Sequence, residues 1–282
     1  MTLSLPAGAS LARLADSVDV LQLDSPLFSA RIALLGGQLI DFTPTGDRPW
    51  LYLSPKAAFQ PGKAIRGGVP LCWPWFGPHP QDSAQPAHGV ARSQAWRLDT
   101  VAREGEAFHV ELSGPRHAGL AAVMRYRLAP DGVDMTLTTR NHSTADLAFS
   151  AALHTYLAVS DIAGITLGGL ENAPCHDKLS DTRATLPAGP LRFDGERDAI
   201  VYSTQDVSLD DAGWARRLLV SRTGSASVVV WNPWQDKTAR LGDLPADGWR
   251  HFVCVEAANA GDDSRTLAPG GCHQLVCRLR KG

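Results

Sequence analysis

The stretch VDMTLT at residues 133–138 alternates apolar and polar side chains, the pattern of a strand with one buried and one solvated face. The same period of two recurs in FHVEL at residues 108–112 and in LVCRL at residues 275–279. The runs SVVVW at residues 227–231 and FVCV at residues 252–255 are continuously apolar, which predicts strands buried on both faces. Together these patterns predict a protein built mainly from antiparallel β-strands.

Turn residues separate the predicted strands at short intervals. The 26 Gly and 19 Pro are spread over all 282 residues, a rhythm typical of a β-sandwich or barrel. RIALLGGQLIDF at residues 31–42 predicts two strands joined by a Gly-Gly turn. Only residues 11–21 have helical spacing, and the polar segment 164–197 fits either a functional loop or an irregular excursion. We therefore expect an all-β fold, a large antiparallel β-sandwich, with residues 1–282 as a single domain.

The charge balance argues against a general nucleic-acid binder. The chain has 27 Lys+Arg against 29 Asp+Glu, a net charge of −2, and no basic run. No apolar stretch approaches the roughly 20 residues that a membrane span needs. Residues 1–20 lack an apolar segment after a basic start, so we expect no signal peptide. These observations predict a cytoplasmic protein with no nucleic-acid partner and no membrane partner.

The cysteine pattern favours reduced thiols. The chain has 5 cysteines, an odd number, and no CxxC pair. Cys254 and Cys277 fall within predicted strands, which indicates buried structural thiols. The Cys-His pairs at residues 175–176 and 272–273 lack metal-ligand spacing to a second pair, so we expect no metal site and no cofactor.

The most unusual stretch is RGGVPLCWPWFG at residues 66–77. Gly67 and Gly68 either let the backbone approach a ligand or adopt positive φ. The aromatic residues of this stretch either stack on a sugar ring or pack a rigid loop onto the sandwich. The guanidinium of Arg66, beside an open backbone, suits a bidentate contact with an oxyanion.

The segment HGVAR at residues 88–92 follows soon after. A loop histidine such as His88 is more often simply solvated, so this motif alone is weak. Together with Arg66, however, His88 and Arg92 place two cations and an imidazole in one region of the chain.

Two further titratable residues lie at predicted strands. If AALHTY at residues 151–156 is a strand, His154 and Tyr156 share one face; the alternative is a core histidine bonded to a backbone carbonyl. Glu256 follows an apolar run at what reads as a strand end. It either faces a buried region, where it would need a partner, or turns out into solvent.

Asp198 and the segment WNPW at residues 231–234 are less informative. Asp198 taken alone is a solvated loop carboxylate by default. The tryptophans of WNPW, with Lys237, either form the wall of a sugar site or cap the sandwich. We find no phosphate-binding glycine loop and no nucleophile elbow.

In this order, five of these segments resemble the aldose 1-epimerase (galactose mutarotase-like) superfamily, and more closely its glucose-6-phosphate 1-epimerase (hexose-6-phosphate mutarotase) branch. The matching segments are residues 66–77, 88–92, 154–156, 231–234 and 253–256. The resemblance implies a supersandwich with a shallow site on one concave face, and no cofactor. It also implies an isomerase that interconverts the α and β anomers of a hexose 6-phosphate, with D-glucose 6-phosphate as the expected substrate and partner.

The resemblance also assigns roles to individual residues. His154 corresponds to the family's catalytic acid and Glu256 to its catalytic base. The remaining matches are the implied substrate-binding residues Arg66, His88, Arg92 and Asp198, of which the two arginines bind phosphate. This chain departs from the family pattern at Ala87, where relatives often carry Gln, and at Ala257, where they commonly carry Pro.

The expected chemistry needs only an acid and a base on opposite sides of C1. Hypothetically, His154 protonates the ring oxygen while Glu256 takes the proton from O1, and the ring opens, rotates and closes again. We expect an anionic neighbour, Glu256 or the substrate phosphate, to raise the protonated fraction of His154. The alternatives are a mutarotase of free aldohexoses and a non-catalytic carbohydrate-binding sandwich. We expect a monomer.

Overall fold

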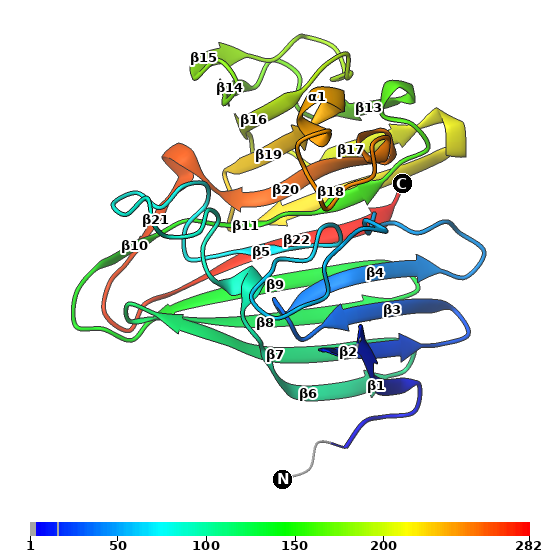
Figure 1. Cartoon of the computed structure of the whole chain (residues 1–282), viewed down its shortest axis with the longest axis vertical. Coiled ribbons are helices and arrows are strands. Elements are labelled where there is room, and N and C mark those ends of the chain that lie inside the picture. The colour runs from blue at the N-terminus through cyan, green and yellow to red at the C-terminus, as the bar shows by residue number, and fades with distance from the viewer. Residues whose placement is uncertain (1–3, 16) are drawn as a thin grey trace.

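The computed structural model describes residues 4–15 and 17–282. Within these residues, one large sheet contains eight antiparallel strands, and its long members form the lower half of the molecule in Figure 1. In spatial order they are β13 (Ile165–Gly168), β17 (Val207–Asp211), β18 (Arg216–Thr223), β22 (Cys272–Lys281), β9 (Gly132–Asn141), β8 (Leu120–Ala129), β7 (Ala107–His117) and β6 (Arg97–Glu104).

A second sheet of eight strands carries the residues of greatest interest. Its order is β15 (Thr182–Thr185), β14 (Pro174–Asp177), β16 (Arg197–Tyr202), β19 (Ser227–Asn232), β20 (Phe252–Asn259), β11 (Ala151–Leu153) and β5 (Leu71–Cys72), and β12 (Tyr156–Ala158) also pairs with β20. All pairings within it are antiparallel. The sequence-based prediction of an all-β antiparallel fold is confirmed.

Smaller elements complete the described chain. A four-stranded sheet contains β1 (Ala9–Leu14), β2 (Val18–Asp24), β3 (Phe28–Ala33) and β4 (Gln38–Pro44), and β10 (Leu147–Phe149) pairs with β21 (Arg265–Leu267). The helical elements are short: α1 (Trp234–Thr238) and the 3₁₀ turns η1 (Ala91–Ser93), η2 (Ile162–Gly164), η3 (Ala212–Trp214), η4 (Gly248–His251) and η5 (Gly261–Asp263). Among the helices that the structure describes, none has the length and apolar character needed to cross a membrane.

Local expectations from the sequence had mixed outcomes. The hairpin at residues 31–42 is confirmed as β3 and β4. The helical spacing of residues 11–21 did not correspond to a helix. β1 and β2 form an antiparallel hairpin there, with Leu11 opposite Leu21. The side chains of β2 alternate between buried and exposed along most of its length, as in a strand with one buried face. The segment 164–197 is not purely irregular, because it contains β13, β14 and β15.

The β19–β20 pair is buried on both faces, as its continuous apolar runs predict, and every residue of both strands is buried. One face, which includes Val230, Val253 and Val255, joins the core cluster shared with the strands of the first large sheet. The opposite face is covered by loops and contributes Val229 and Cys254 to two smaller clusters. Because side chains alternate along a strand, Glu256 lies on the same loop-covered face as Cys254. Both large sheets therefore contribute to one core cluster.

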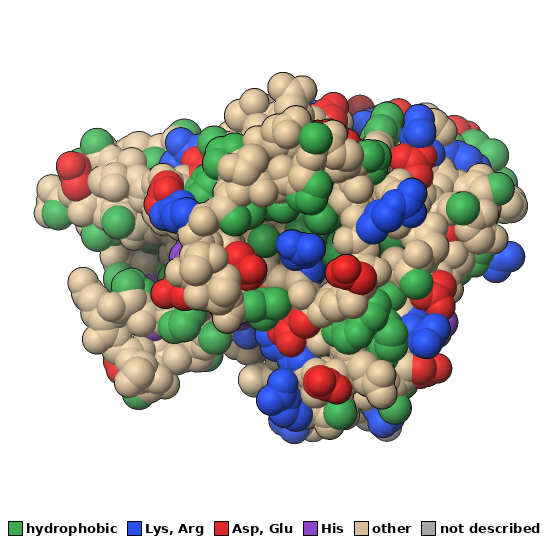
Figure 2. Space-filling view, turned by 90° about the horizontal axis from the view of Figure 1, so that it is seen from above, with side chains coloured by type: hydrophobic (Ala, Val, Ile, Leu, Met, Phe, Trp, Pro, Cys, Tyr) green, Lys and Arg blue, Asp and Glu red, His purple; other side chains and the backbone are tan. Residues whose placement is uncertain are grey.

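All five cysteines are free, and Cys254 and Cys277 are buried, as predicted, whereas Cys272 is exposed. On the face of the molecule shown in Figure 2, acidic and basic side chains are interspersed and do not form a continuous basic patch. That distribution fits the near-zero net charge of the whole chain.

Candidate active site

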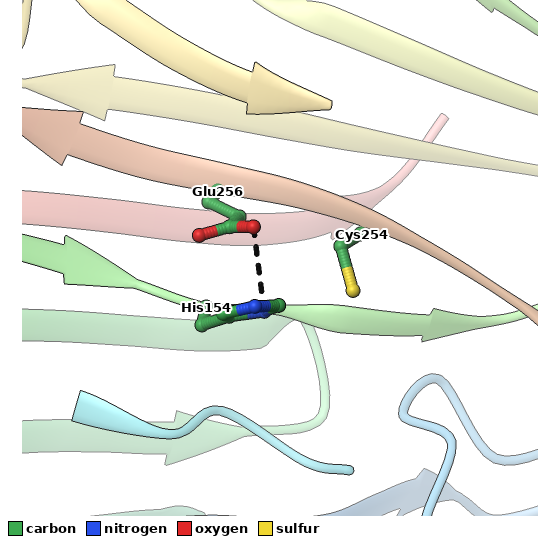
Figure 3. Close-up of side chains that lie close together, drawn as sticks. All are labelled: His154, Cys254 and Glu256. Carbon is green, nitrogen blue, oxygen red and sulfur yellow. Dashed lines mark ion pairs between the residues drawn. The ribbon is translucent and has the colours of Figure 1, made fainter. Parts of the chain in front are cut away.

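His154 and Glu256, remote in sequence, meet on the loop-covered face of the second sheet. On β20, Ala257 pairs with Leu153 of β11, and Cys254 pairs with Tyr156 of β12. His154 lies in the gap between these two short strands and faces Glu256. The distance between His154 Nδ1 and Glu256 Oε1 is 3.4 Å. Figure 3 shows both side chains directed toward each other. Glu256 lies within β20 and not at a strand end, which corrects the sequence-based expectation.

The two side chains are buried without partners. Glu256 is 0% exposed and His154 is 8% exposed. Among the residues that the structure describes, neither carboxylate oxygen of Glu256 nor Nδ1 of His154 has a hydrogen-bond partner. Native proteins contain few such groups, and each needs an explanation such as a missing ligand. The alternative of a solvated Glu256 is therefore wrong.

Burial controls the protonation of this pair. It raises the pKa of Glu256 well above its ordinary value, and Asp198 raises that pKa further, whereas Arg92 opposes the shift. Burial lowers the pKa of His154 well below its ordinary value, and the positive fields of Arg92 and Arg66 act in the same direction. Both shifts favour the uncharged forms of Glu256 and His154. The expectation that Glu256 raises the protonated fraction of His154 is wrong, because burial lowers the pKa of the imidazole.

The separation of the pair also changes the expected arrangement around the sugar. A gap of 3.4 Å leaves no room for a pyranose ring between the two side chains. The acid and the base lie side by side, so a sugar would have to approach both from one direction. This arrangement remains compatible with anomer exchange, because O1 and the ring oxygen are bonded to the same carbon.

Aromatic residues hold the imidazole in place. The Tyr156 ring stacks on His154, with centroids 4.9 Å apart and planes inclined by 12°, which confirms that the two residues share one side. Trp231 meets the imidazole edge-on at 5.7 Å. Trp234, the other tryptophan of its segment, packs instead against Trp249 at 4.4 Å. The segment therefore contributes one residue to the site and one to the packing around it.

Arg66 is tied to the pair through Tyr156. Its Nη1 donates a hydrogen bond to Tyr156 Oη at 2.9 Å, and its Nε is 3.0 Å from Asp243 Oδ2. Tyr156 and Asp243 raise the pKa of Arg66 above its ordinary value. Within the described part of the chain, its Nη2 makes no hydrogen bond, so one edge of the guanidinium remains available to a ligand.

A cavity of about 470 Å³, which we call the basic pocket, opens beside Arg66. Its charged lining residues are Lys56, Lys63, Arg66, Arg92 and Asp243, and Tyr156 also lines it. Sequence reasoning found the arginines and missed the lysines. The signal that could have revealed them is KAAFQPGKAIR at residues 56–66, which has three cations within one loop.

The HGVAR segment places both of its expected residues near the pair. The His88 ring centroid lies 6.2 Å from that of His154, and Arg92 Nη2 donates to the Ala87 carbonyl at 2.8 Å. Burial, together with Arg92 and Arg66, lowers the pKa of His88 to about 3, so this imidazole is neutral. Its Nδ1 accepts from the Gly77 amide at 3.3 Å, which leaves the proton on Nε2 as a hydrogen-bond donor.

Asp198 lies on a strand, β16, and not in a loop. It is opposite Trp231, which is opposite Cys254, so the three residues form a row on the face that carries Glu256. Burial raises the pKa of Asp198, and Lys237 Nζ lies 4.0 Å from its carboxylate. The structure thus brings together all six residues expected in the site.

The glycine pair and the aromatic loop serve packing. Gly67 and Gly68 have φ of 110° and 63°. A Cβ on Gly67 would lie 2.4 Å from the Tyr52 carbonyl oxygen, so close backbone packing requires glycine there. Trp73 is 0% exposed, and its indole donates to Thr139 Oγ1 at 3.0 Å. The interpretation of a packed, rigid loop is correct for Gly67 and Trp73.

The aldose 1-epimerase family model matches residues 19–280. The chain belongs to the aldose 1-epimerase family. It is 34% identical over 263 residues to an Escherichia coli (strain K12) protein named "Putative glucose-6-phosphate 1-epimerase", which covers 92% of this chain and 89% of that one. A Salmonella typhimurium protein of the same name is 32% identical over 278 residues, 94% of this chain and 92% of its own.

Solved structures agree with the family assignment. A crystal structure of a Salmonella typhimurium protein described as a "putative mutarotase" superposes with a TM-score of 0.91 and 27% identity, and the match covers 100% of this chain and 96% of that one. A galactose mutarotase-like protein from Clostridium acetobutylicum superposes with a TM-score of 0.71 at 13% identity, covering 97% and 98% of the two chains, which shows a shared fold. The family resemblance and the fold class inferred from the sequence are confirmed.

Proposed function

We propose that this member of the aldose 1-epimerase family is a hexose-6-phosphate mutarotase that interconverts the α and β anomers of D-glucose 6-phosphate. The observation that carries the proposal is the unpartnered His154–Glu256 pair beside the basic pocket. The names of the relatives from Escherichia coli and Salmonella typhimurium support the same substrate. The volume of the basic pocket falls within the range of small-ligand sites.

In the proposed reaction, His154 gives a proton to the ring oxygen while Glu256 takes the proton from O1. The bond between C1 and the ring oxygen breaks, and C1 becomes an aldehyde carbon. Rotation about C1–C2 then presents the other face of the aldehyde, and closure reverses both proton transfers. The pair holds one proton before and after the cycle, so the reaction consumes no acid or base.

Phosphate binding supports the protonation state that this reaction needs. Besides burial, which is the largest cause, Arg92 and Arg66 lower the pKa of His154. A phosphate dianion beside these arginines offsets their fields and raises the pKa of His154, which favours the charged form of this imidazole. The substrate thereby helps to charge the acid that acts on it.

Recognition of the phosphate is proposed to rest on the basic pocket. The free edge of Arg66 and the guanidinium of Arg92 suit charge-assisted hydrogen bonds to phosphate oxygens. Lys56 and Lys63 add positive charge to the same pocket. His88 Nε2 and the Asp198 carboxylate are left to contact sugar hydroxyls. Ala87 cannot supply the polar contact that a Gln would provide there.

Four cations against one carboxylate in the basic pocket favour a phosphorylated sugar over a free hexose. The decisive experiment is anomer exchange spectroscopy by NMR on D-glucose 6-phosphate and on D-glucose, each with and without protein. We expect a large acceleration with the phosphate ester and a small one with glucose. Equal acceleration of both would indicate a mutarotase of free aldohexoses, and no acceleration of either would indicate a non-catalytic sugar-binding protein. The five free cysteines fit the reducing cytoplasm, where we propose that the protein acts.

A further inference from the structure

We propose that His154, Cys254 and Glu256 form a binding site for Zn²⁺ and related thiophilic ions, and that occupation of this site reversibly blocks the active site. The three ligand atoms lie within 4.8 Å of one another, and all three residues are buried. Figure 3 shows the Cys254 thiol next to the His154–Glu256 pair. Neither the roles that the family resemblance assigns nor the proposed reaction uses Cys254.

The strand geometry creates this group. Cys254 and Glu256 are two residues apart on β20, so both side chains lie on the loop-covered face. His154 faces them from the gap between β11 and β12. A tetrahedral zinc ion with bonds of about 2.0–2.2 Å to nitrogen and oxygen requires those two atoms to be about 3.4 Å apart. His154 Nδ1 and Glu256 Oε1 are 3.4 Å apart, a separation too long for a good hydrogen bond.

The donor atoms favour zinc over the abundant hard cations. Imidazole nitrogen, thiolate and carboxylate together form a zinc ligand set, whereas Mg²⁺ and Ca²⁺ prefer sites made of oxygen atoms. In the described residues, the Glu256 oxygens and His154 Nδ1 have no protein partner that the ion would have to displace. Three protein ligands leave a fourth position for water, as in zinc sites that are not closed.

Charge sets the strength of the site. Binding displaces the Cys254 thiol proton and the proton held by the His154–Glu256 pair, and both protons pass to the buffer. Thiolate and carboxylate then neutralise the two charges of Zn²⁺. Arg66 and Arg92, which act electrostatically on His154, repel the free ion as it approaches. The expected result is reversible inhibition and not a permanently bound metal.

The experiment has a spectroscopic arm that does not depend on activity. Co²⁺ is titrated into the full-length protein, and thiolate-to-cobalt charge-transfer absorption is recorded. We expect one equivalent of Co²⁺ to bind with this band, displaced by Zn²⁺ and unaffected by excess Mg²⁺. The band disappears in Cys254→Ala and persists in Cys272→Ala, the matched control at the exposed cysteine. A wild-type protein without the band overturns the proposal, as does a band that survives in Cys254→Ala.

The inhibition arm rests on the proposed function. We expect Zn²⁺ to raise the apparent KM for D-glucose 6-phosphate, and Cys254→Ala to remain active while requiring at least about tenfold more Zn²⁺ for the same inhibition. Equal inhibition of the wild type and of Cys254→Ala overturns the proposal, and so does activity that EDTA abolishes and Zn²⁺ restores. If the protein has no mutarotase activity but shows the Cys254-dependent band, the proposed function fails and the metal site stands. If Cys254→Ala does not fold, the near-isosteric Cys254→Ser replaces it in both arms.

Discussion

The His154–Glu256 pair and the basic pocket are neighbours in space, yet they are built from different parts of the fold. Glu256 lies on β20, a central strand that is buried on both faces, and His154 faces it from the gap between β11 and β12. Strand pairing on either side of Glu256 fixes the geometry of the pair. The basic pocket is formed by loops, and its lysines Lys56 and Lys63 are exposed. Under the proposed function, bond making and breaking belong to the sheet, and recognition of the phosphate belongs mainly to the loops.

One residue connects the two regions. Tyr156 accepts a hydrogen bond from Arg66 and stacks on His154, so it belongs to the basic pocket and also supports the pair. The separation is therefore one of function and not of contact. Substitutions in the two regions should therefore differ in their effects on kcat, KM and pH dependence. These differences test the proposed division of roles.

The largest effect is expected from substituting the pair itself. Glu256→Gln and His154→Ala should each lower kcat by 10²-fold or more, and equally for D-glucose 6-phosphate and D-glucose, because both sugars need the same proton transfers. The measurement is anomer exchange by NMR, with Glu104→Gln as a control at an exposed carboxylate. A kcat within threefold of the wild type for either variant would remove that residue from the proposed reaction.

The next effect concerns the phosphate. Arg66→Ala should weaken the apparent affinity for D-glucose 6-phosphate by about 10- to 100-fold, because a hydrogen bond to a charged group contributes about 1.5–3 kcal/mol. Turnover of free D-glucose should change much less. Arg66→Lys should lie between the wild type and Arg66→Ala, because it keeps the charge and loses the planar fork. Arg31→Ala, at a surface ion pair, is the control. An unchanged affinity for the phosphate ester would refute the assignment of Arg66.

A smaller effect is expected from the two lysines. The double substitution Lys56→Ala and Lys63→Ala should raise KM for D-glucose 6-phosphate by about two- to tenfold, since exposed charges interact weakly through water. The difference from the wild type should shrink as salt is added, because ions screen exposed charges. Lys281→Ala provides a control remote from the basic pocket. A KM difference that is independent of salt would contradict a purely electrostatic role.

The smallest effect is a shift in pH dependence. Arg92 lowers the pKa of both Glu256 and His154, so Arg92→Ala should raise both values. The pair titrates as a unit and reacts while it holds one proton. Both limbs of the kcat/KM profile should therefore move to higher pH in Arg92→Ala. D-glucose is the substrate of choice here, because it has no phosphate that titrates near pH 6. A profile that stays in place or moves to lower pH would contradict the proposed field of Arg92.

The sequence was sufficient for the architecture because strand periodicity is local. Alternation in residues 133–138 and the apolar runs that became β19 and β20 predicted strands with the correct faces. The hairpin of β1 and β2 was missed, because the apolar residues of segment 11–21 resemble a helical spacing by chance, whereas Leu11 pairs with Leu21 across two strands. In such a short segment the two periods cannot be separated without the tertiary pairing.

The site residues that belong to sequence motifs could be predicted from the sequence. The contacts that depend on the tertiary fold could not. His154, Glu256 and Arg66 were found through their segments, and the two-residue spacing puts Cys254 and Glu256 on one face of their strand. Nothing local indicated that His154 would meet both of them, because this depends on the pairing of β11 and β12 with β20. The protonation of the pair was also misjudged. Sequence reasoning counted Glu256 as an anion that would charge His154, whereas the structure removes both from water, and burial outweighs their mutual attraction.

The most direct test of the account is the ratio of kcat/KM for D-glucose 6-phosphate to that for D-glucose, measured by anomer exchange in three proteins. In Glu256→Gln, both rates should fall at least 10²-fold while the ratio stays close to that of the wild type. In Arg66→Ala, the ratio itself should fall at least about tenfold. If Arg66→Ala lowered both rates equally, or if Glu256→Gln impaired only the phosphate ester, chemistry and recognition would not be divided between sheet and loops.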